Sequence, residues 1–145
     1  MFLVDTNILI YAVHRESPDH QRAAAAIRTW QHDRESWFTT WPILYEFLRV
    51  TTHPRVFDQP LTFELASRFV AKLFTAESFD VLTETTRHSA VVQELAGDVP
   101  WARGSVMHDL HTVALMREHG VPEIRTADTG FHRFRGLRVV NPLVA

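Results

Sequence analysis

The chain has 145 residues, of which 46% are hydrophobic and 22% are charged, and this is typical of one globular domain with a substantial core. The formal charge of -2 excludes a global basic field of the kind that binds nucleic acid non-specifically, so any such binding needs a local basic cluster. The absence of cysteine excludes disulfides, thiolate zinc sites and cysteine nucleophiles.

The apolar residues of the chain are spread over many short runs. Nowhere do about 18 apolar residues follow one another, as a membrane-spanning helix requires. The first residues also lack the basic and apolar regions of a secretory signal. We therefore expect a single domain over residues 1–145, located in the cytoplasm and without a membrane attachment.

The first twelve residues predict a strand that runs directly into a helix. Phe2–Val4 is a short apolar run typical of a buried strand. Asp5, Thr6 and Asn7 are residue types that cap helices, and apolar residues at helical spacing follow from Ile8. In a parallel sheet this junction lies at the carboxyl end of the strand, where ligands bind, so we expect Asp5 to project into a crevice.

The rest of the chain alternates strand-like runs with helical patterns. We predict further strands at residues 37–39, 79–82, 123–126 and 137–140. We predict helices at residues 20–31, 43–51, 61–74, 85–95 and 106–118, with Thr85 capping the fourth of these and a loop at 97–104. Strands alternating with helices predict an α/β fold, with a central parallel sheet of four to five strands and helices on both faces.

Four acidic residues fall near one edge of this predicted sheet. Asp5 ends the first strand, Asp128 follows the fourth strand, and Glu46 lies in the first turns of the helix after the second strand. Asp109 lies early in the helix before the fourth strand and joins the others if that helix starts at the same edge. Two carboxylates about 4 Å apart repel by roughly 4 kcal/mol at an effective dielectric near 20, so a cluster of them needs protons or cations.

The predicted acidic cluster has the chemistry of a site for a hard cation. Carboxylate ligands with few imidazoles favour Mg²⁺ or Mn²⁺, and such an ion can bind a phosphodiester and activate water to attack it. We expect Thr6, Asn7 and Thr126 to hold the carboxylates or the water by hydrogen bonds. Each acid taken singly also has a structural explanation as a helix cap, a turn residue or a surface group, and the pattern alone leaves both interpretations open.

The order and spacing of these motifs resemble the PIN-domain family from Met1 to about Leu143. More narrowly, the chain is similar to the VapC-type toxins of bacterial toxin–antitoxin pairs. One departure is Leu110, because the family often has alanine after the third acidic residue. The segments that carry the resemblance are Phe2-Leu-Val-Asp5-Thr6-Asn7, Pro42-Ile-Leu-Tyr-Glu46, Asp109 in the helix that ends Glu118-His-Gly, and Thr126-Ala-Asp128-Thr-Gly-Phe131.

This resemblance implies a PIN-like three-layer α/β/α sandwich and a Mg²⁺- or Mn²⁺-dependent endoribonuclease. It also implies a homodimer, and inhibition by a cognate VapB-type antitoxin. The acidic quartet is carried over to Asp5, Glu46, Asp109 and Asp128, with Asp5, Asp109 and Asp128 as metal ligands and Thr6, Asn7 and Thr126 as supporting polar groups. Apolar residues that suit either a subunit interface or the core are Trp37, Tyr45, Phe69 and Leu73.

An RNA substrate needs cationic and aromatic contacts outside the acidic quartet. We predict that Arg15 and Arg133 bind phosphate, and that Trp41 or Trp101 stacks on an unpaired base. Each of these residues is also explained as a solvated arginine or a packing tryptophan. The loop at 97–104 matches no motif, so its part in substrate choice stays open.

Two other functions stay open at this point. The order of His88, His108-Asp109 and Asp128 resembles the HD-type metal phosphohydrolases that act on nucleotides, but their fold is all-helical and the strand-like runs argue against it. His108 and His111 have a helical spacing that suits either zinc or two exposed side chains. The second alternative is a non-catalytic module that binds RNA or an antitoxin, and it predicts no metal-dependent cleavage.

Overall fold

The structure, a computed structural model, describes residues 1–144. Its centre is a five-stranded sheet in the order β3-β2-β1-β4-β5, and every strand runs parallel to its neighbours. All three residues of the central strand β1 are buried, as expected for a strand covered on both faces. The strands are β1 (Phe2–Val4), β2 (Trp37–Thr39), β3 (Phe79–Val81), β4 (Glu123–Arg125) and β5 (Arg138–Val140).

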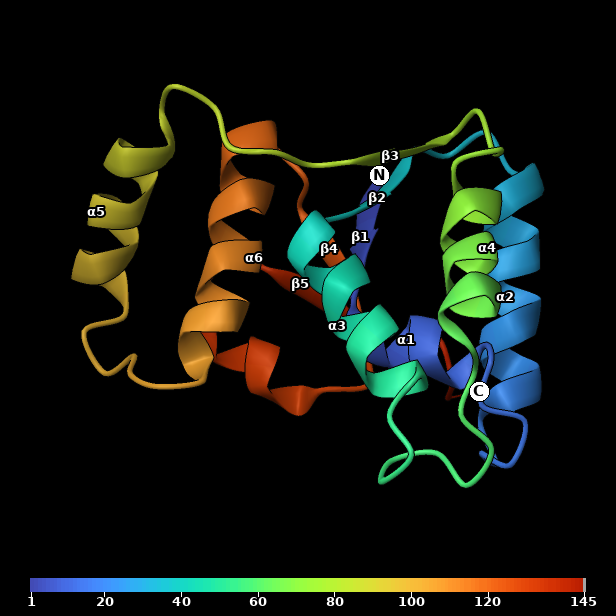
Figure 1. Ribbon diagram of the computed structural model, residues 1–145. Helices are drawn as coiled ribbons and strands as arrows, with labels where there is room; N and C mark the ends of the chain where they lie inside the picture. The colour runs from blue at the N-terminus through green and yellow to red at the C-terminus, as the bar shows by residue number, and fades with distance from the viewer. Residues whose placement is uncertain (145) are drawn as a thin grey trace.

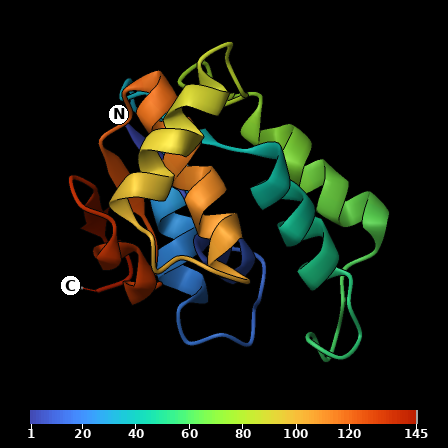
Figure 2. The same cartoon turned by 90° about the vertical axis from the view of Figure 1, so that its left-hand side faces the viewer.

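Helices cover both faces of this sheet and complete a three-layer sandwich (Figure 1). α2 and α4 lie on one side of the sheet, α6 lies on the other side, and α5 packs outside α6 (Figures 1 and 2). None of the helices within residues 1–144 is long and apolar enough to cross a membrane. The helices are α1 (Thr6–Tyr11), α2 (His20–His32), α3 (Trp41–Thr51), α4 (Phe63–Leu73), α5 (His88–Asp98), α6 (Val106–His119) and the short 3-10 helix η1 (Thr129–Arg133).

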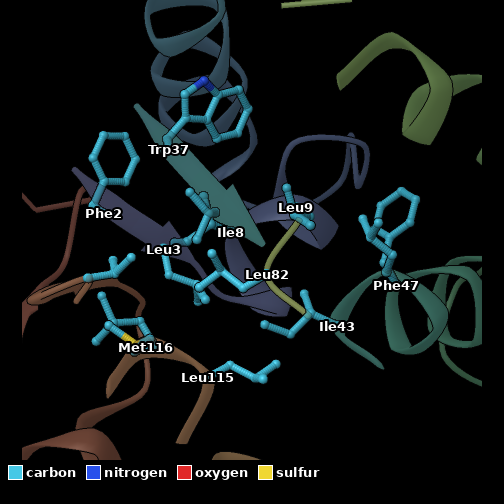
Figure 3. Close-up of a cluster of buried hydrophobic side chains, with 14 of the residues drawn as sticks. Phe2, Leu3, Ile8, Leu9, Trp37, Ile43, Phe47, Leu82, Leu115 and Met116 are labelled. Carbon is cyan, nitrogen blue, oxygen red and sulfur yellow. The ribbon is translucent and has the colours of Figure 1, made fainter. Parts of the chain in front are cut away.

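The core fills the space on both sides of β1 (Figure 3). Phe2 packs against Trp30 of α2 and Trp37 of β2, with ring centroids 5.1 and 6.4 Å apart. The next residue, Leu3, points to the opposite face, where Met116 of α6 is buried (Figure 3). This packing fixes the end of β1, and therefore the position of the residues that follow it.

Local capping contacts fix two helix ends, and α3 begins at Trp41, two residues before its predicted start. The hydroxyl of Thr40 accepts a hydrogen bond from the Ile43 amide at 3.2 Å, and Pro42 lies in the first turn of α3. α6 ends at His119, and Gly120 follows in the left-handed conformation with a φ of 67°.

The predicted boundaries of α5 are wrong. The helix begins at His88 and not at Thr85, because the Thr85 amide and hydroxyl both donate to Glu118 of α6 instead of starting a helix. It also continues to Asp98, so Gly97 lies inside the helix and the loop before α6 is shorter than predicted.

The structure also decides between core and surface for most of the proposed interface residues. Trp37 and Leu73 are fully buried, and Phe69 stacks on Phe47 with a centroid distance of 4.9 Å. Core packing therefore accounts for these residues. Tyr45 is different, because 67% of it is exposed.

Candidate functional site

The carboxyl ends of the parallel strands meet at one edge of the sheet, and an acidic groove lies there. Asp5 directly follows β1, and its amide donates to the Arg125 carbonyl at the end of β4 at 3.1 Å. Asp128 comes three residues after that carbonyl. The groove has a volume of about 980 Å³, and its acidic lining residues are Asp5, Glu46 and Asp109.

A hydrogen-bond network across β1 and β4 fixes the Asp5 carboxylate. Oδ1 accepts from the Thr6 amide at 2.8 Å, while Oδ2 accepts from Asn7 Nδ2 at 3.0 Å and from the Thr126 hydroxyl at 2.7 Å. The structure thus brings all three predicted supporting residues to Asp5. A carboxylate has about four acceptor positions, and three are used here, so one remains for an external ligand.

The same network reaches the segment that carries Asp128. The Thr126 hydroxyl oxygen accepts from Asn7 Nδ2 at 3.0 Å and from the Asp128 amide at 2.9 Å. Asn7 Oδ1 accepts from the Ala127 amide at 3.0 Å, which fixes the orientation of the side-chain amide. The Asp128 carboxylate is exposed and caps η1 by accepting from the Gly130 amide at 2.8 Å.

Asp5, Asp109 and Asp128 influence one another electrostatically. Burial raises the pKa of Asp5; hydrogen bonds from Thr126 and Thr6 oppose this rise, and the charge of Asp128 adds to it. Burial, and then the charges of Asp5 and Asp128, raise the pKa of Asp109 to about 6. Burial and neighbouring negative charge therefore disfavour the charged forms of Asp5 and Asp109 unless a cation lies beside them.

Glu46 lines the same groove but is already paired. Arg49, one turn further along α3, donates from Nε to Glu46 Oε2 at 3.0 Å and from Nη2 to Oε1 at 2.7 Å. These hydrogen bonds are the main reason why the pKa of Glu46 lies below its ordinary value, and the charge of His108 contributes to the decrease. Both members of the pair are largely exposed, so the ion pair is a weak restraint on Glu46.

The three aspartates form an open arrangement and not a closed cage. Their carboxylate oxygens do not all lie within 4.8 Å of one another; in residues 1–144 the one group of three His, Asp or Glu ligand atoms that meets this distance is Glu84, His88 and His111. An open set of carboxylates suits Mg²⁺, because this ion keeps several of its waters and binds proteins through one or two carboxylates. The donor atoms therefore fit a hydrated hard cation.

The two arginines predicted to bind RNA lie in different places. The guanidinium carbon of Arg133 is 3.9 Å from the centroid of the Trp101 ring, and both residues line a cavity of about 550 Å³ together with Arg103. The charge of Arg133 also acts on Asp109 and lowers its pKa. Arg15 follows the end of α1 and lines a separate cavity, so the structure does not bring it to the acidic groove.

The sequence pointed to His108 only for the HD-type and zinc alternatives, and it did not point to Arg103. His108 lines the groove, and its charge lowers the pKa of both Glu46 and Asp109. Its position directly before Asp109 at the start of α6 is the signal that could have placed it there. Arg103 lies in the loop between α5 and α6, and no pattern in the sequence predicts the path of that loop.

The HD-type alternative is wrong, because the chain folds around a five-stranded sheet and not into a helical bundle. Its expected residues are also separated in the structure. His88 donates to or accepts from Glu118 at 2.6 Å and lies beside His111, not beside Asp109.

The sequence of this α/β/α sandwich, which carries acidic residues at one edge of its sheet, resembles those of known proteins. The family model described as PIN domain matches residues 2–137. Ribonuclease VapC48 of Mycobacterium tuberculosis is 31% identical over 138 residues, which cover 95% of this chain and 94% of that protein. Ribonuclease VapC33 of the same organism is 33% identical over 150 residues, which cover 99% of each chain.

Solved structures share the fold at lower sequence identity. VapC20 of Mycobacterium tuberculosis, described as a sarcin-ricin loop cleaving toxin, matches with a TM-score of 0.64 and 18% identity, covering 95% of this chain and 99% of that one. VapBC2 of Rickettsia felis, bound to a promoter DNA fragment, matches with a TM-score of 0.66 and 13% identity over 97% of each chain. This chain therefore shares with these proteins an α/β/α sandwich built around a parallel sheet. The chain belongs to the PIN-domain family, and VapC ribonucleases are its homologues.

Proposed function

We propose that this chain is the toxin of a type II toxin–antitoxin pair and acts as a divalent-metal-dependent endoribonuclease on RNA phosphodiester bonds. The observation that carries the proposal is the placement of Asp5 and Asp109 in one groove at the carboxyl edge of the sheet, with Asp128 tied to Asp5 through the Thr126 hydroxyl. Full-length similarity to proteins named as VapC ribonucleases supports RNA as the substrate.

Asp5, Asp109 and Asp128 are the proposed ligands of Mg²⁺ or Mn²⁺. When bound, the ion supplies Lewis-acid polarisation of the phosphodiester and activation of water. Asn7 and Thr126 hold the Asp5 carboxylate so that one acceptor position stays free for the ion. The charged forms of Asp5 and Asp109 are disfavoured in the absence of a cation, so binding of one also relieves the repulsion that acts on these two carboxylates.

Glu46 is the proposed fourth acidic residue, with a role in binding water or substrate. Its partner Arg49 is largely exposed, and an exposed ion pair of this kind is weak and easily exchanged for another partner. A phosphate of the RNA can therefore replace Glu46 as the ion-pair partner of Arg49. The Glu46 carboxylate is then free to accept a hydrogen bond in the groove. Arg49 then contributes a bidentate phosphate contact of the kind that guanidinium groups favour.

RNA beyond the cleaved bond is proposed to bind over the cavity lined by Trp101, Arg103 and Arg133. Trp101 is 41% exposed, and Arg133 covers its ring face, so a base can replace the guanidinium on the ring or stack against it. The freed cation then faces the phosphate backbone. Arg15 contacts RNA only if the substrate extends across α1, away from the groove.

We further propose a cytoplasmic homodimer that is inhibited by a VapB-type antitoxin. One related structure contains the VapBC2 complex of Rickettsia felis. The acidic groove suits a basic segment of such an antitoxin, and the exposed Tyr45 on its wall offers an apolar contact beside it.

The proposal is tested by incubating total cellular RNA with the purified protein in chelator, in Mg²⁺ and in Mn²⁺. Asp5→Asn and Asp109→Asn are compared with Asp80→Asn as a matched control. Asp80 is an exposed aspartate whose Oδ1 accepts from the next amide at 2.8 Å, as Asp5 does, but it does not line the groove.

We expect discrete RNA products that require the metal, persist in Asp80→Asn and vanish in Asp5→Asn and Asp109→Asn. Loss of a single metal ligand commonly lowers the rate by orders of magnitude, so partial activity in both variants would contradict the assigned roles. A wild-type protein that binds RNA but cleaves none with either ion would point instead to a non-catalytic binding module.

A further inference from the structure

A second group of metal-ligating side chains lies between α5 and α6, and the proposed nuclease chemistry does not use it. Glu84 and His88 come from the segment that leads from β3 into α5, and His111 comes from α6. One ligand atom from each of the three lies within 4.8 Å of the other two. This is a tighter cluster than Asp5, Asp109 and Asp128 form.

Glu118 fixes the orientation of His88 in this cluster. The Glu118 side chain is fully buried, and its Oε2 lies 2.6 Å from His88 Nδ1. Its Oε1 accepts from the amide and the hydroxyl of Thr85, each at 2.9 Å. Because Nδ1 is occupied, Nε2 is the free nitrogen of His88. A buried carboxylate that holds the second nitrogen of a histidine is the usual support behind a histidine metal ligand.

The other two residues close the cluster from the solvent side. His111 Nε2 lies 2.7 Å from Glu84 Oε1, and the two imidazole rings stand nearly perpendicular, with centroids 5.8 Å apart. The Glu84 side chain is 53% exposed, whereas the His88 and His111 side chains are 27% and 26% exposed. An ion can therefore enter from solvent and displace only an exposed contact between Glu84 and His111.

We propose that Glu84, His88 and His111 bind a transition-metal dication, namely Zn²⁺, with a fourth position open to water. Two imidazoles and one carboxylate form a ligand set typical of zinc sites with an open position, and imidazole selects Zn²⁺ over Mg²⁺. Bonds of about 2.1 Å place tetrahedral ligands about 3.4 Å apart, so we expect the exposed Glu84 to rotate slightly when it completes the site.

A metal at this position links α5 to α6. It would also place positive charge near the groove, because His111 lies two residues after Asp109 and lines the same groove. The inference stands on the cluster alone and does not rest on the proposed nuclease function. Failure of either proposal therefore leaves the other unaffected.

The test is a titration of the full chain with Co²⁺ in excess Mg²⁺, followed by displacement with Zn²⁺. Co²⁺ bound to imidazole in a four-coordinate site gives visible absorption bands, whereas Co²⁺ in an all-oxygen six-coordinate site absorbs weakly. We expect one strong site per chain, released by Zn²⁺. Glu84→Gln, His88→Gln and His111→Gln should each weaken the affinity at least tenfold, while His108→Gln on the same helix should leave the spectrum unchanged.

Absence of strong bands in the wild-type protein would overturn the proposal. Bands that survive in both His88→Gln and His111→Gln, or that disappear in Asp109→Asn, would assign the Co²⁺ to the acidic groove and overturn it as well. His88→Gln removes a partner of the buried Glu118 and can loosen the fold. In that case Glu84→Gln and His111→Gln, whose contact faces solvent, decide the outcome.

Discussion

Thr126 lies at the centre of the hydrogen-bond network that orients Asp5 beside the acidic groove. Its hydroxyl donates to Asp5 and accepts from both Asn7 and the Asp128 amide, so it connects the two strand ends that carry proposed metal ligands. It is also almost fully buried, so water cannot replace these bonds if the hydroxyl is removed.

Thr126→Val tests this dependence with a side chain of the same shape. We expect the single-turnover cleavage rate to fall about tenfold or more, as for other groups that orient a metal ligand. Stability should fall by about 1–3 kcal/mol, because buried partners lose their hydrogen bonds. Thr126→Ser keeps the hydroxyl and should recover most of the rate; equal loss in both variants would refute a role for the hydroxyl.

Asp109 makes stability depend on pH in the absence of metal. Its pKa is raised from 3.8 in the unfolded chain to about 6 in the folded protein. Between these values the folded state holds more protons than the unfolded state, so the free energy of unfolding falls as the pH rises. The loss is complete above about pH 6.

Asp109→Asn should therefore be more stable than the wild type in chelator at pH 7.5, by about 1–2 kcal/mol after allowance for the partial exposure of the site. The variant should also lose the fall in stability between pH 4 and pH 6, as measured by urea unfolding at several pH values. Cleavage should be abolished at the same time, a stability gain at the expense of function. A variant less stable than the wild type at pH 7.5 would contradict the raised pKa.

At the scale of single elements, α6 has the largest share of the proposed chemistry. The first turn of α6 places His108 and Asp109 in the groove. Further along the same helix, His111 and Glu118 contact residues at the start of α5. The helix ends through Gly120, whose φ of 67° is the left-handed conformation that glycine adopts without strain.

Gly120→Ala should lower the free energy of unfolding by about 1 kcal/mol, because alanine is strained in this conformation although space for its Cβ is open. Gly97→Ala, inside α5, is the matched control and should be neutral or slightly stabilising. Thermal unfolding of the two variants checks this. Equal melting temperatures of the two variants would mean that the backbone after α6 adjusts to alanine without strain, and would contradict this prediction.

The sequence predicts most of the fold because local signals mark its elements. Short runs with apolar or β-branched residues identify the strands, and Gly120 marks the end of α6. The start of α5 was mispredicted because Thr85 has a capping side chain but uses it on Glu118, which is 33 residues away. A contact of that kind belongs to tertiary structure and leaves no periodic pattern in the sequence.

Local sequence signals predict some of the site residues, whereas tertiary contacts determine the positions of the others. Asp5, Thr6, Asn7, Thr126 and Asp128 follow strands directly, so parallel topology alone brings them to one edge. Residues outside such positions depend on how helices and loops pack. Examples are Arg15, which lies away from the groove, and the cluster of Glu84, His88 and His111, whose members come from separate elements.

At the scale of the whole molecule, the net charge of -2 conceals a local arrangement that suits RNA. Acidic residues and Arg49 line the groove, while Arg103 and Arg133 line a second cavity. Binding of RNA is therefore expected to depend on these few arginines and to weaken strongly with salt.

Arg133→Ala should weaken the affinity for single-stranded RNA several-fold and reduce the dependence of log K on log salt by about 0.7, the value for one phosphate contact. The control is Arg135→Ala, because Arg135 is an exposed arginine two residues later. It should have a smaller effect on the affinity for RNA and on its salt dependence. The measurement is fluorescence anisotropy in Ca²⁺ with Asp5→Asn, which prevents cleavage. An unchanged slope in Arg133→Ala would contradict the proposed contact.

The position of α5 has a consequence for the motions of the molecule. This helix lies outside α6 and away from the sheet (Figure 1), and the Glu118 contacts tie its first turn to α6. Amide hydrogens of α5 should therefore exchange with solvent through a local opening, earlier than those of α6, which exchange only when the core opens. The α5 segment is then a separate cooperative unit at the margin of the fold, able to detach while the strands and the acidic groove stay intact.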